Sequence, residues 1–97
     1  MIVALALVSV SCAGGPGDDT LGVELYNVSC ARCHGGDLEG GIGPALDATS
    51  NTGLVLTDEQ IGNVIQVGPG AMPAFGQLTD AQVASLVDYL RERHARD

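Results

Sequence analysis

Cys30-Ala31-Arg32-Cys33-His34 is the stretch of sequence around which the chain is organised. Two cysteines at this spacing, followed at once by histidine, form the attachment motif of a c-type haem. Each thiol can bond to one haem side chain, and the adjacent imidazole is then placed as the proximal ligand of the iron. We therefore expect one covalent haem c, held by Cys30, Cys33 and His34.

Three other interpretations of the two cysteines compete with haem attachment. A thioredoxin-like redox dithiol requires a βαβ pattern around it, and the sequence contains none. Half of a zinc site requires further ligands, and the other candidates, Cys12 and His94, lie towards the two ends of the chain. The third interpretation is a disulfide between Cys30 and Cys33, or a chance match. The motif favours haem over all three.

The composition leaves little material for an interior made of side chains. The 97 residues are enough for one small domain and include 14 glycines, two tyrosines, one phenylalanine and no tryptophan. Domains of this size usually need a stabilising element besides their core. A covalent haem supplies a large apolar disc for side chains to pack against, so the scarcity of aromatic residues agrees with a haem at the centre.

The charge restricts the possible partners. The formal net charge is −8, from twelve acidic residues against four arginines. Nucleic-acid binding requires a basic face, so we exclude nucleic acid as a partner. Protein partners are expected to dock through a basic or a mainly apolar surface of their own. The alternative is that the acidic residues only keep a small carrier in solution.

The first residues differ in character from the rest. Residues 1–11 are apolar and uncharged, too short to span a bilayer as a standard helix, and typical of the apolar part of an export signal. We predict an export signal at 1–12, a flexible tether at 13–19 and a monohaem domain at 20–97. Cys12 resembles the lipidated cysteine of a bacterial lipoprotein, and ordinary cleavage near Cys12 or Ala13 is the alternative. Either way, the mature chain is expected to work outside the cytoplasm.

Three stretches carry helical patterns, and no stretch alternates as a strand would, which predicts an all-α fold. The first helix is expected from about Thr20 to Cys30, with one face formed by Gly22, Leu25, Tyr26 and Cys30. Capping boxes at 57–60 and 79–82 predict a short helix that ends near Gly68 and a last helix over 80–93. Their apolar faces are formed by Ile61, Val64 and Ile65, and by Val83, Leu86, Val87 and Leu90. His94 follows among arginines and is expected to be a solvated surface residue.

Two loops carry the remaining candidate site residues. The loop at 35–46 is rich in glycine and suits a change of direction beside a flat ligand. A ligating imidazole needs its other N–H held by an acceptor, for which we propose the carbonyl of Pro44; a simple turn proline is the alternative. Residues 47–56 are expected to be a polar, featureless loop.

The second loop, Gly-Pro-Gly-Ala-Met-Pro-Ala-Phe-Gly at 68–76, presents Met72. A thioether sulfur is a soft ligand that suits haem iron opposite histidine. The alternative for a methionine is core packing. The only other methionine is Met1, in the predicted export signal. We therefore expect His34 and Met72 as the two axial ligands of the iron.

The residues quoted above resemble those of a class I c-type cytochrome, over roughly Thr20 to Arg93. The Gly-Pro-Ala-Leu after the haem motif and the Met72-Pro73 loop look most like small bacterial monohaem cytochromes and the haem domain of cbb3-type oxidase subunit III. The resemblance implies three to four short helices wrapped around one covalently attached haem with one edge exposed. It also implies that the first and last helices cross through Gly22, Tyr26 and Tyr89. The lysine ring of the mitochondrial relatives is absent.

With both axial positions filled, the function expected is that of a periplasmic single-electron carrier without substrate chemistry of its own. The resemblance implies as partners a quinol-oxidising complex and a terminal oxidase, reductase or photosynthetic centre, with the carrier itself a monomer. Two alternatives stay open. One is a membrane-anchored subunit of a larger oxidoreductase complex, tethered through Cys12. The other is a haem enzyme or gas-binding module with a labile sixth ligand.

Overall fold

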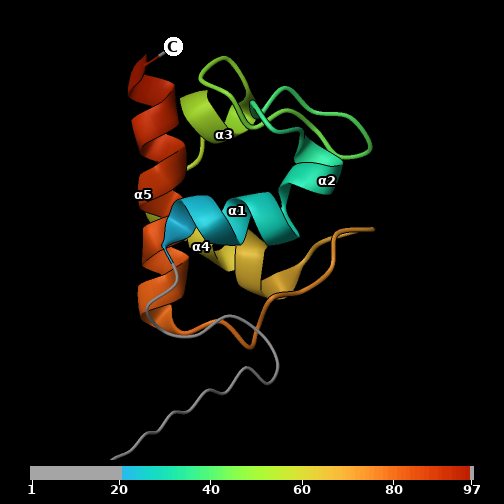
Figure 1. Ribbon diagram of the computed structural model, residues 1–97, viewed down its shortest axis with the longest axis vertical. Coiled ribbons are helices and arrows are strands. Elements are labelled where there is room, and N and C mark those ends of the chain that lie inside the picture. The colour runs from blue at the N-terminus through green and yellow to red at the C-terminus, as the bar shows by residue number, and fades with distance from the viewer. Residues whose placement is uncertain (1–20, 97) are drawn as a thin grey trace, which may run out of the picture.

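The computed structural model describes residues 21–96 and folds them into five helices, with no strand in that range (Figure 1). The helices are α1 (Gly22–Ser29), α2 (Ala31–His34), α3 (Asn51–Leu54), α4 (Asp58–Val67) and α5 (Asp80–Arg96). The all-α prediction is confirmed. The expected number of three to four helices is too low, because α2 and α3 are single turns without an apolar stripe. The predicted export signal, the tether, Cys12 and Thr20 lie outside the described residues.

The frame of the molecule is the crossing of α1 and α5 (Figure 1). Gly22 is buried there, and its amide donates to Ser85 Oγ at 2.7 Å. One turn further along α1, Tyr26 packs on Tyr89 with ring centroids 5.4 Å apart. The glycine lets the two backbones approach closely, and the aromatic pair fills the space beside them. None of the helices in 21–96 has the length and apolar character needed to cross a membrane.

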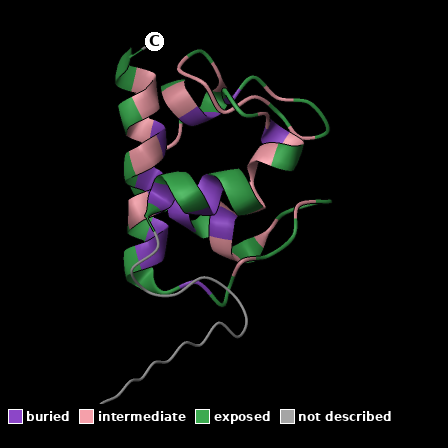
Figure 2. Cartoon of the chain, viewed as in Figure 1, coloured by how far each residue is buried: buried purple, intermediate pink, exposed green. Residues whose placement is uncertain are grey.

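The apolar stripe of α5 meets α4 on the other side of this crossing, where buried residues gather (Figure 2). All four predicted stripe residues of α5 are buried, as are Ile61 and Ile65 of α4. Both predicted capping boxes are present. Thr57 and Gln60 exchange two hydrogen bonds at the start of α4, and Thr79 and Gln82 do so before α5. Capping fixes where these helices begin, so their position along the chain was predictable.

The segment at 47–56 is not the featureless loop that the sequence suggested. Asp47 turns the chain by accepting hydrogen bonds from Thr49, and Ser50 caps α3 through its hydroxyl oxygen. Thr52 is buried within this turn. A four-residue helix has too few positions for an apolar stripe, and its caps are its only local signal.

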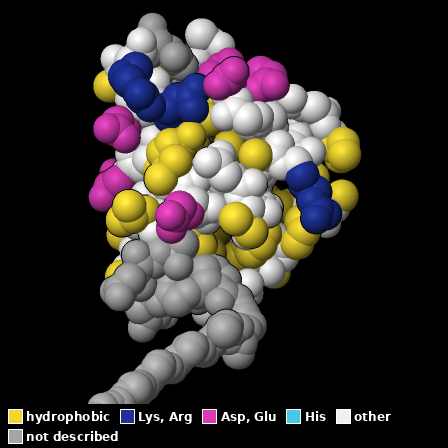
Figure 3. Space-filling view, viewed as in Figure 1, with side chains coloured by type: hydrophobic (Ala, Val, Ile, Leu, Met, Phe, Trp, Pro, Cys, Tyr) yellow, Lys and Arg dark blue, Asp and Glu magenta, His cyan; other side chains and the backbone are white. Residues whose placement is uncertain are grey.

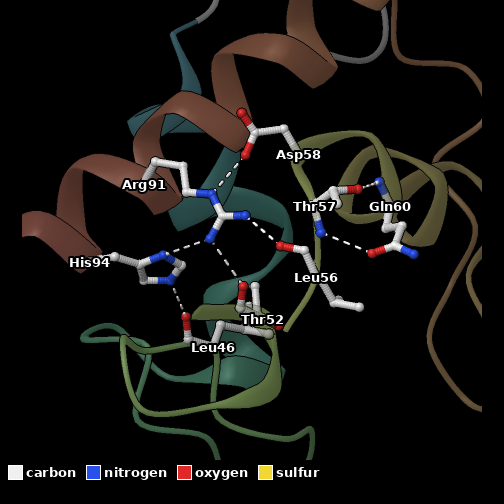
Figure 4. A network of polar contacts seen from close by, with 8 residues as sticks. All are labelled: Leu46, Thr52, Leu56, Thr57, Asp58, Gln60, Arg91 and His94. Atoms are coloured by element: carbon white, nitrogen blue, oxygen red, sulfur yellow. Dashed lines mark hydrogen bonds and ion pairs between the residues drawn. The ribbon is translucent and has the colours of Figure 1, made fainter. Parts of the chain in front are cut away.

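His94 is not a solvated surface residue, as Figure 4 shows. Its Nε2 donates to the Leu46 carbonyl at 2.7 Å, and its Nδ1 accepts from Arg91 at 3.3 Å. A carbonyl can only accept and a guanidinium can only donate, so in this pair of contacts Nε2 is the donor and Nδ1 the acceptor. His94 therefore joins the end of α5 to the segment that follows the glycine-rich loop.

Arg91 also joins α5 to the segment before α4, through more hydrogen bonds than His94 makes (Figure 4). Its guanidinium donates to the Leu56 carbonyl at 2.6 Å and the Thr52 carbonyl at 3.1 Å, and forms an ion pair with Asp58 at 2.7 Å. By its position alone, an arginine in the C-terminal half of a helix is expected to complement the helix dipole. In the fold, Arg91 holds α3 and the start of α4 against α5.

Replacing Arg91 with alanine is expected to lower the free energy of unfolding of the haem-loaded protein by about 2 kcal/mol, the usual range for hydrogen bonds from a charged donor. Arg91→Lys keeps the positive charge but loses the planar fork, so most of the loss should remain. Guanidinium titrations of both variants measure it. If Arg91→Lys were as stable as the parent protein, charge alone would explain the contact and the two carbonyl bonds would not matter.

Candidate functional site

The haem motif lies on the single turn α2, with Cys30 as its N-terminal cap. The Cys33 and His34 amides both donate to the Cys30 carbonyl, at 3.1 and 3.0 Å. This turn keeps the two cysteines and the histidine together on a short, rigid piece of backbone. Both thiols are free and half-buried, and the His34 side chain is buried.

The surroundings of the two thiols argue against two of the alternatives to haem attachment, a redox dithiol and a zinc site. Burial, with the neighbouring Cys33 as a smaller contribution, raises the pKa of the Cys30 thiol to about 11. Redox dithiols have lowered thiol pKa values, because the thiolate is the reactive form. Among residues 21–96, no group of three or more His, Cys, Asp or Glu side chains is placed to hold a metal ion. The described part of the chain thus favours neither a redox dithiol nor a zinc site.

His34 is held by the loop that follows it. Its Nδ1 donates to the Pro44 carbonyl at 2.7 Å, which leaves Nε2 as the ring nitrogen that can offer a lone pair. A Cβ on Gly43 would lie only 3.0 Å from His34 Cε1. The glycine therefore lets the loop backbone pass directly against the imidazole. The hydrogen bond expected at Pro44 is present in the structure.

The backbone of the 35–46 loop is fastened to α2 at several points. The Gly40 amide donates to the His34 carbonyl, and the Gly43 amide to the Cys33 carbonyl, both at 2.7 Å. Leu38 anchors the middle of the loop, since its side chain is fully buried although its φ is 64°. A leucine tolerates the left-handed region only when the surroundings hold it there, so the loop is well defined.

Met72 lies on the separate loop between α4 and α5. The loop starts at Gly68, where φ is 65° and a Cβ would lie 2.5 Å from the Ala74 backbone nitrogen. It closes through a 3.0 Å hydrogen bond from the Phe75 amide to the Ile65 carbonyl. Met72 is half-buried within it. The structure thus brings Cys30, Cys33, His34 and Pro44 together, whereas the ligand role of Met72 stays a prediction.

The donor set and the exposed apolar side chains of the described residues fit a haem. Two thiols suit thioether attachment and an oriented imidazole suits iron. Large hydrophobic side chains are exposed in the segments that carry or separate the candidate ligands, and Figure 3 shows such side chains open to solvent on one face. The exposed side chains in those segments belong to Ile42, Leu54, Val55 and Val67, with exposed fractions of 86%, 73%, 66% and 67%. A bound apolar group would remove such surface from water.

Sequence reasoning missed one polar contact beside the site and one set of polar contacts in the surrounding fold. The buried Tyr26 hydroxyl donates to the Gly35 carbonyl at 2.7 Å, directly after His34. Burial raises the pKa of this phenol well above its ordinary value, so it stays a donor. A tyrosine on a predicted buried face was the available signal, because a buried hydroxyl needs a partner. The Arg91 contacts left no signal in local sequence, since their partners lie far along the chain.

Comparisons with known proteins agree with this site. Residues 17–90 match the family described as cytochrome C oxidase, cbb3-type, subunit III. The chain is 39% identical over 72 residues to cytochrome c-551 of Bacillus subtilis, covering 74% of this chain and 61% of the relative. It is 41% identical over 75 residues to cytochrome c55X of Stutzerimonas stutzeri, covering 75% and 66%.

A third relative, cytochrome c6 of Picosynechococcus, is 28% identical over 105 residues, covering 95% of this chain and 90% of the relative. For the first two relatives, in contrast, the chain spans less than two thirds of their length. The family match covers most of the chain and includes the whole haem attachment motif. The chain therefore belongs to the cbb3-type subunit III family of class I c-type cytochromes and carries covalent haem c.

Proposed function

We propose that the protein is a single-electron carrier with histidine and methionine as axial ligands and no substrate chemistry of its own. The observation that carries the proposal is the 2.7 Å hydrogen bond from His34 Nδ1 to the Pro44 carbonyl, beside two free thiols. It supplies an imidazole of fixed orientation, which a permanent proximal ligand requires. The names of the relatives, all cytochromes, support the same function.

When bound, haem c supplies an iron centre that takes up and releases one electron. Cys30 and Cys33 hold the group covalently. His34 binds through Nε2, and its hydrogen bond to Pro44 makes the imidazole a better donor. Met72 supplies a soft sulfur that favours the reduced state and raises the potential. If His34 and Met72 both bound the iron, they would leave no coordination position open to water or substrate.

The location and partners follow from the same proposal. Covalent haem and the predicted export signal support a location outside the cytoplasm. The partners are redox proteins: a quinol-oxidising complex upstream, and a terminal oxidase, reductase or photosynthetic centre downstream. The low count of basic residues favours partners whose docking face is basic or mainly apolar.

Replacing Met72 with alanine tests the axial ligand. The haem should stay attached, while the midpoint potential should fall by on the order of 0.1 V within the ~0.8 V range set by axial ligands. The vacated position should also bind carbon monoxide. Potentiometric titration and absorption spectra with and without carbon monoxide measure both effects.

Gln77→Ala is the matched control, because Gln77 is exposed and lies shortly after the Met72 loop. It should leave the potential and the carbon monoxide response unchanged. An unaltered potential in Met72→Ala would refute the methionine assignment. Carbon monoxide binding by the parent protein at rest would instead favour a gas-binding module or haem enzyme.

The second candidate is a bound subunit of a larger oxidoreductase complex, which the description of the matched family favours. Electron transfer would be the same, but the protein would not diffuse freely. The intact mass of the mature chain, taken together with its distribution between membrane and soluble fractions, separates the two. A lipid on Cys12 and recovery with the membrane would support the subunit.

A further inference from the structure

We propose that the Tyr26 hydroxyl is a positioning group for His34, and that it sets the orientation of the ligand through the Gly35 peptide. The inference rests on the proposed role of His34 as proximal ligand. Tyr26 is 1% exposed, and its hydroxyl donates to the Gly35 carbonyl at 2.7 Å. A phenylalanine would fill the same space beside Tyr89, so packing alone does not require the hydroxyl.

Gly35 is the residue at which the chain leaves the haem motif. Its φ is 89°, a conformation open to glycine, which has no Cβ to restrict it. Hydrogen bonds therefore have to hold the two peptide groups that meet at Gly35. The Gly35 amide donates to the Ala31 carbonyl at 2.7 Å, and the Gly35 carbonyl accepts from Tyr26 and, at 3.2 Å, from the Leu38 amide. The Tyr26 bond is the shorter of the two on the carbonyl.

His34 is thus restrained from both sides of its own backbone. Its amide is bound to the Cys30 carbonyl and its carbonyl to the Gly40 amide. Its ring is bound at Nδ1 to the Pro44 carbonyl. If the Gly35 peptide rotated, the start of the 35–46 loop would shift, and both Gly40 and Pro44 would move relative to the imidazole. Tyr26 prevents this from α1, a helix that is itself fixed on α5.

The neighbouring Tyr89 hydroxyl provides a matched comparison. It accepts from Arg93 Nη1 at 3.0 Å, and Arg93 continues to Asp37 at 3.5 Å, where Asp37 is largely exposed. Both tyrosines belong to the same aromatic pair. Only the Tyr26 hydroxyl, however, donates directly to Gly35, the residue that follows His34. A loss of packing or of one hydroxyl would affect both variants alike.

The test is Tyr26→Phe beside Tyr89→Phe, each as haem-loaded protein, with the hyperfine-shifted His34 ring resonances of the ferric state as readout. Tyr26→Phe should shift and broaden these resonances, and the Gly40 amide should exchange with deuterium at least tenfold faster. Tyr89→Phe should leave both unchanged. Equal behaviour of the two variants would overturn the inference. If the parent protein lacked ligated-histidine resonances, the proposed ligand set would fail instead.

A measurement on the parent protein keeps the inference testable if Tyr26→Phe gives no holoprotein. The Tyr26 hydroxyl proton should exchange slowly enough to be seen by NMR and should correlate with the Gly35 carbonyl. A hydroxyl proton in fast exchange with water would overturn the inference without any substitution.

Discussion

Replacing Cys30 and Cys33 together with alanine is expected to abolish covalent haem and, with it, the folded state. The buried hydrophobic set consists of leucine, isoleucine and valine side chains with Tyr26. A chain of this size rarely holds itself together by such a core alone. We expect loss of essentially all stability, about 5 kcal/mol for a small domain.

Intact mass, haem absorption and far-ultraviolet circular dichroism measure the outcome. Ser29→Ala is the matched control, since it changes the residue next to the motif and leaves both thiols in place. It should retain the haem mass and the helical signal. A colourless double variant that unfolds cooperatively, with native helix content, would contradict the view that haem completes the core.

Replacing Gly22 with alanine is expected to disrupt the crossing of α1 and α5. The new Cβ would overlap the Ser85 carbonyl oxygen and lie 2.6 Å from the Ser85 carbonyl carbon. Backbone atoms cannot rotate away as a side chain would. The overlap should therefore lower the free energy of unfolding by more than the usual 1–3 kcal/mol of overpacking. Alanine favours a helix over glycine by up to about 1 kcal/mol, which offsets part of the cost. We expect a net loss of about 3 kcal/mol, or roughly 15 °C in Tm.

Gly36→Ala is the control for this substitution. A Cβ on Gly36 meets nothing within 4 Å, and the residue is exposed. Gly36→Ala should change the free energy of unfolding by no more than about 0.5 kcal/mol. Thermal unfolding of both haem-loaded variants measures the difference in their stability. If the two substitutions cost the same, the close approach of α1 and α5 at Gly22 is not required for stability.

Much of the fold could be predicted because its signals are local. The two capping boxes join residues three apart, and the α5 stripe repeats within two turns. The segment at 47–56 could not be predicted in the same way. Its single helical turn is held by Asp47 and Ser50 within the segment and by Arg91 from α5. A short helix without an apolar stripe depends on such distant contacts.

The candidate site divides in the same way. The spacing of Cys30, Cys33 and His34, and the nearby Pro44 carbonyl, follow from one short stretch of chain. The Tyr26 bond to Gly35 could be suspected only from a tyrosine on a buried face. The partners of Arg91 and His94 could not be predicted, because arginine and histidine near a helix end have an ordinary local explanation in the helix dipole.

The sequence by itself determined the covalent cofactor and the starts of α4 and α5, since these depend on residues a few positions apart. Only the tertiary structure decided that α5 holds the segment 46–58 through Arg91 and His94, and that α1 supports the Gly35 peptide. The physical reason is that a hydrogen bond across the fold requires two distant atoms within about 3 Å. No spacing along the chain specifies that distance.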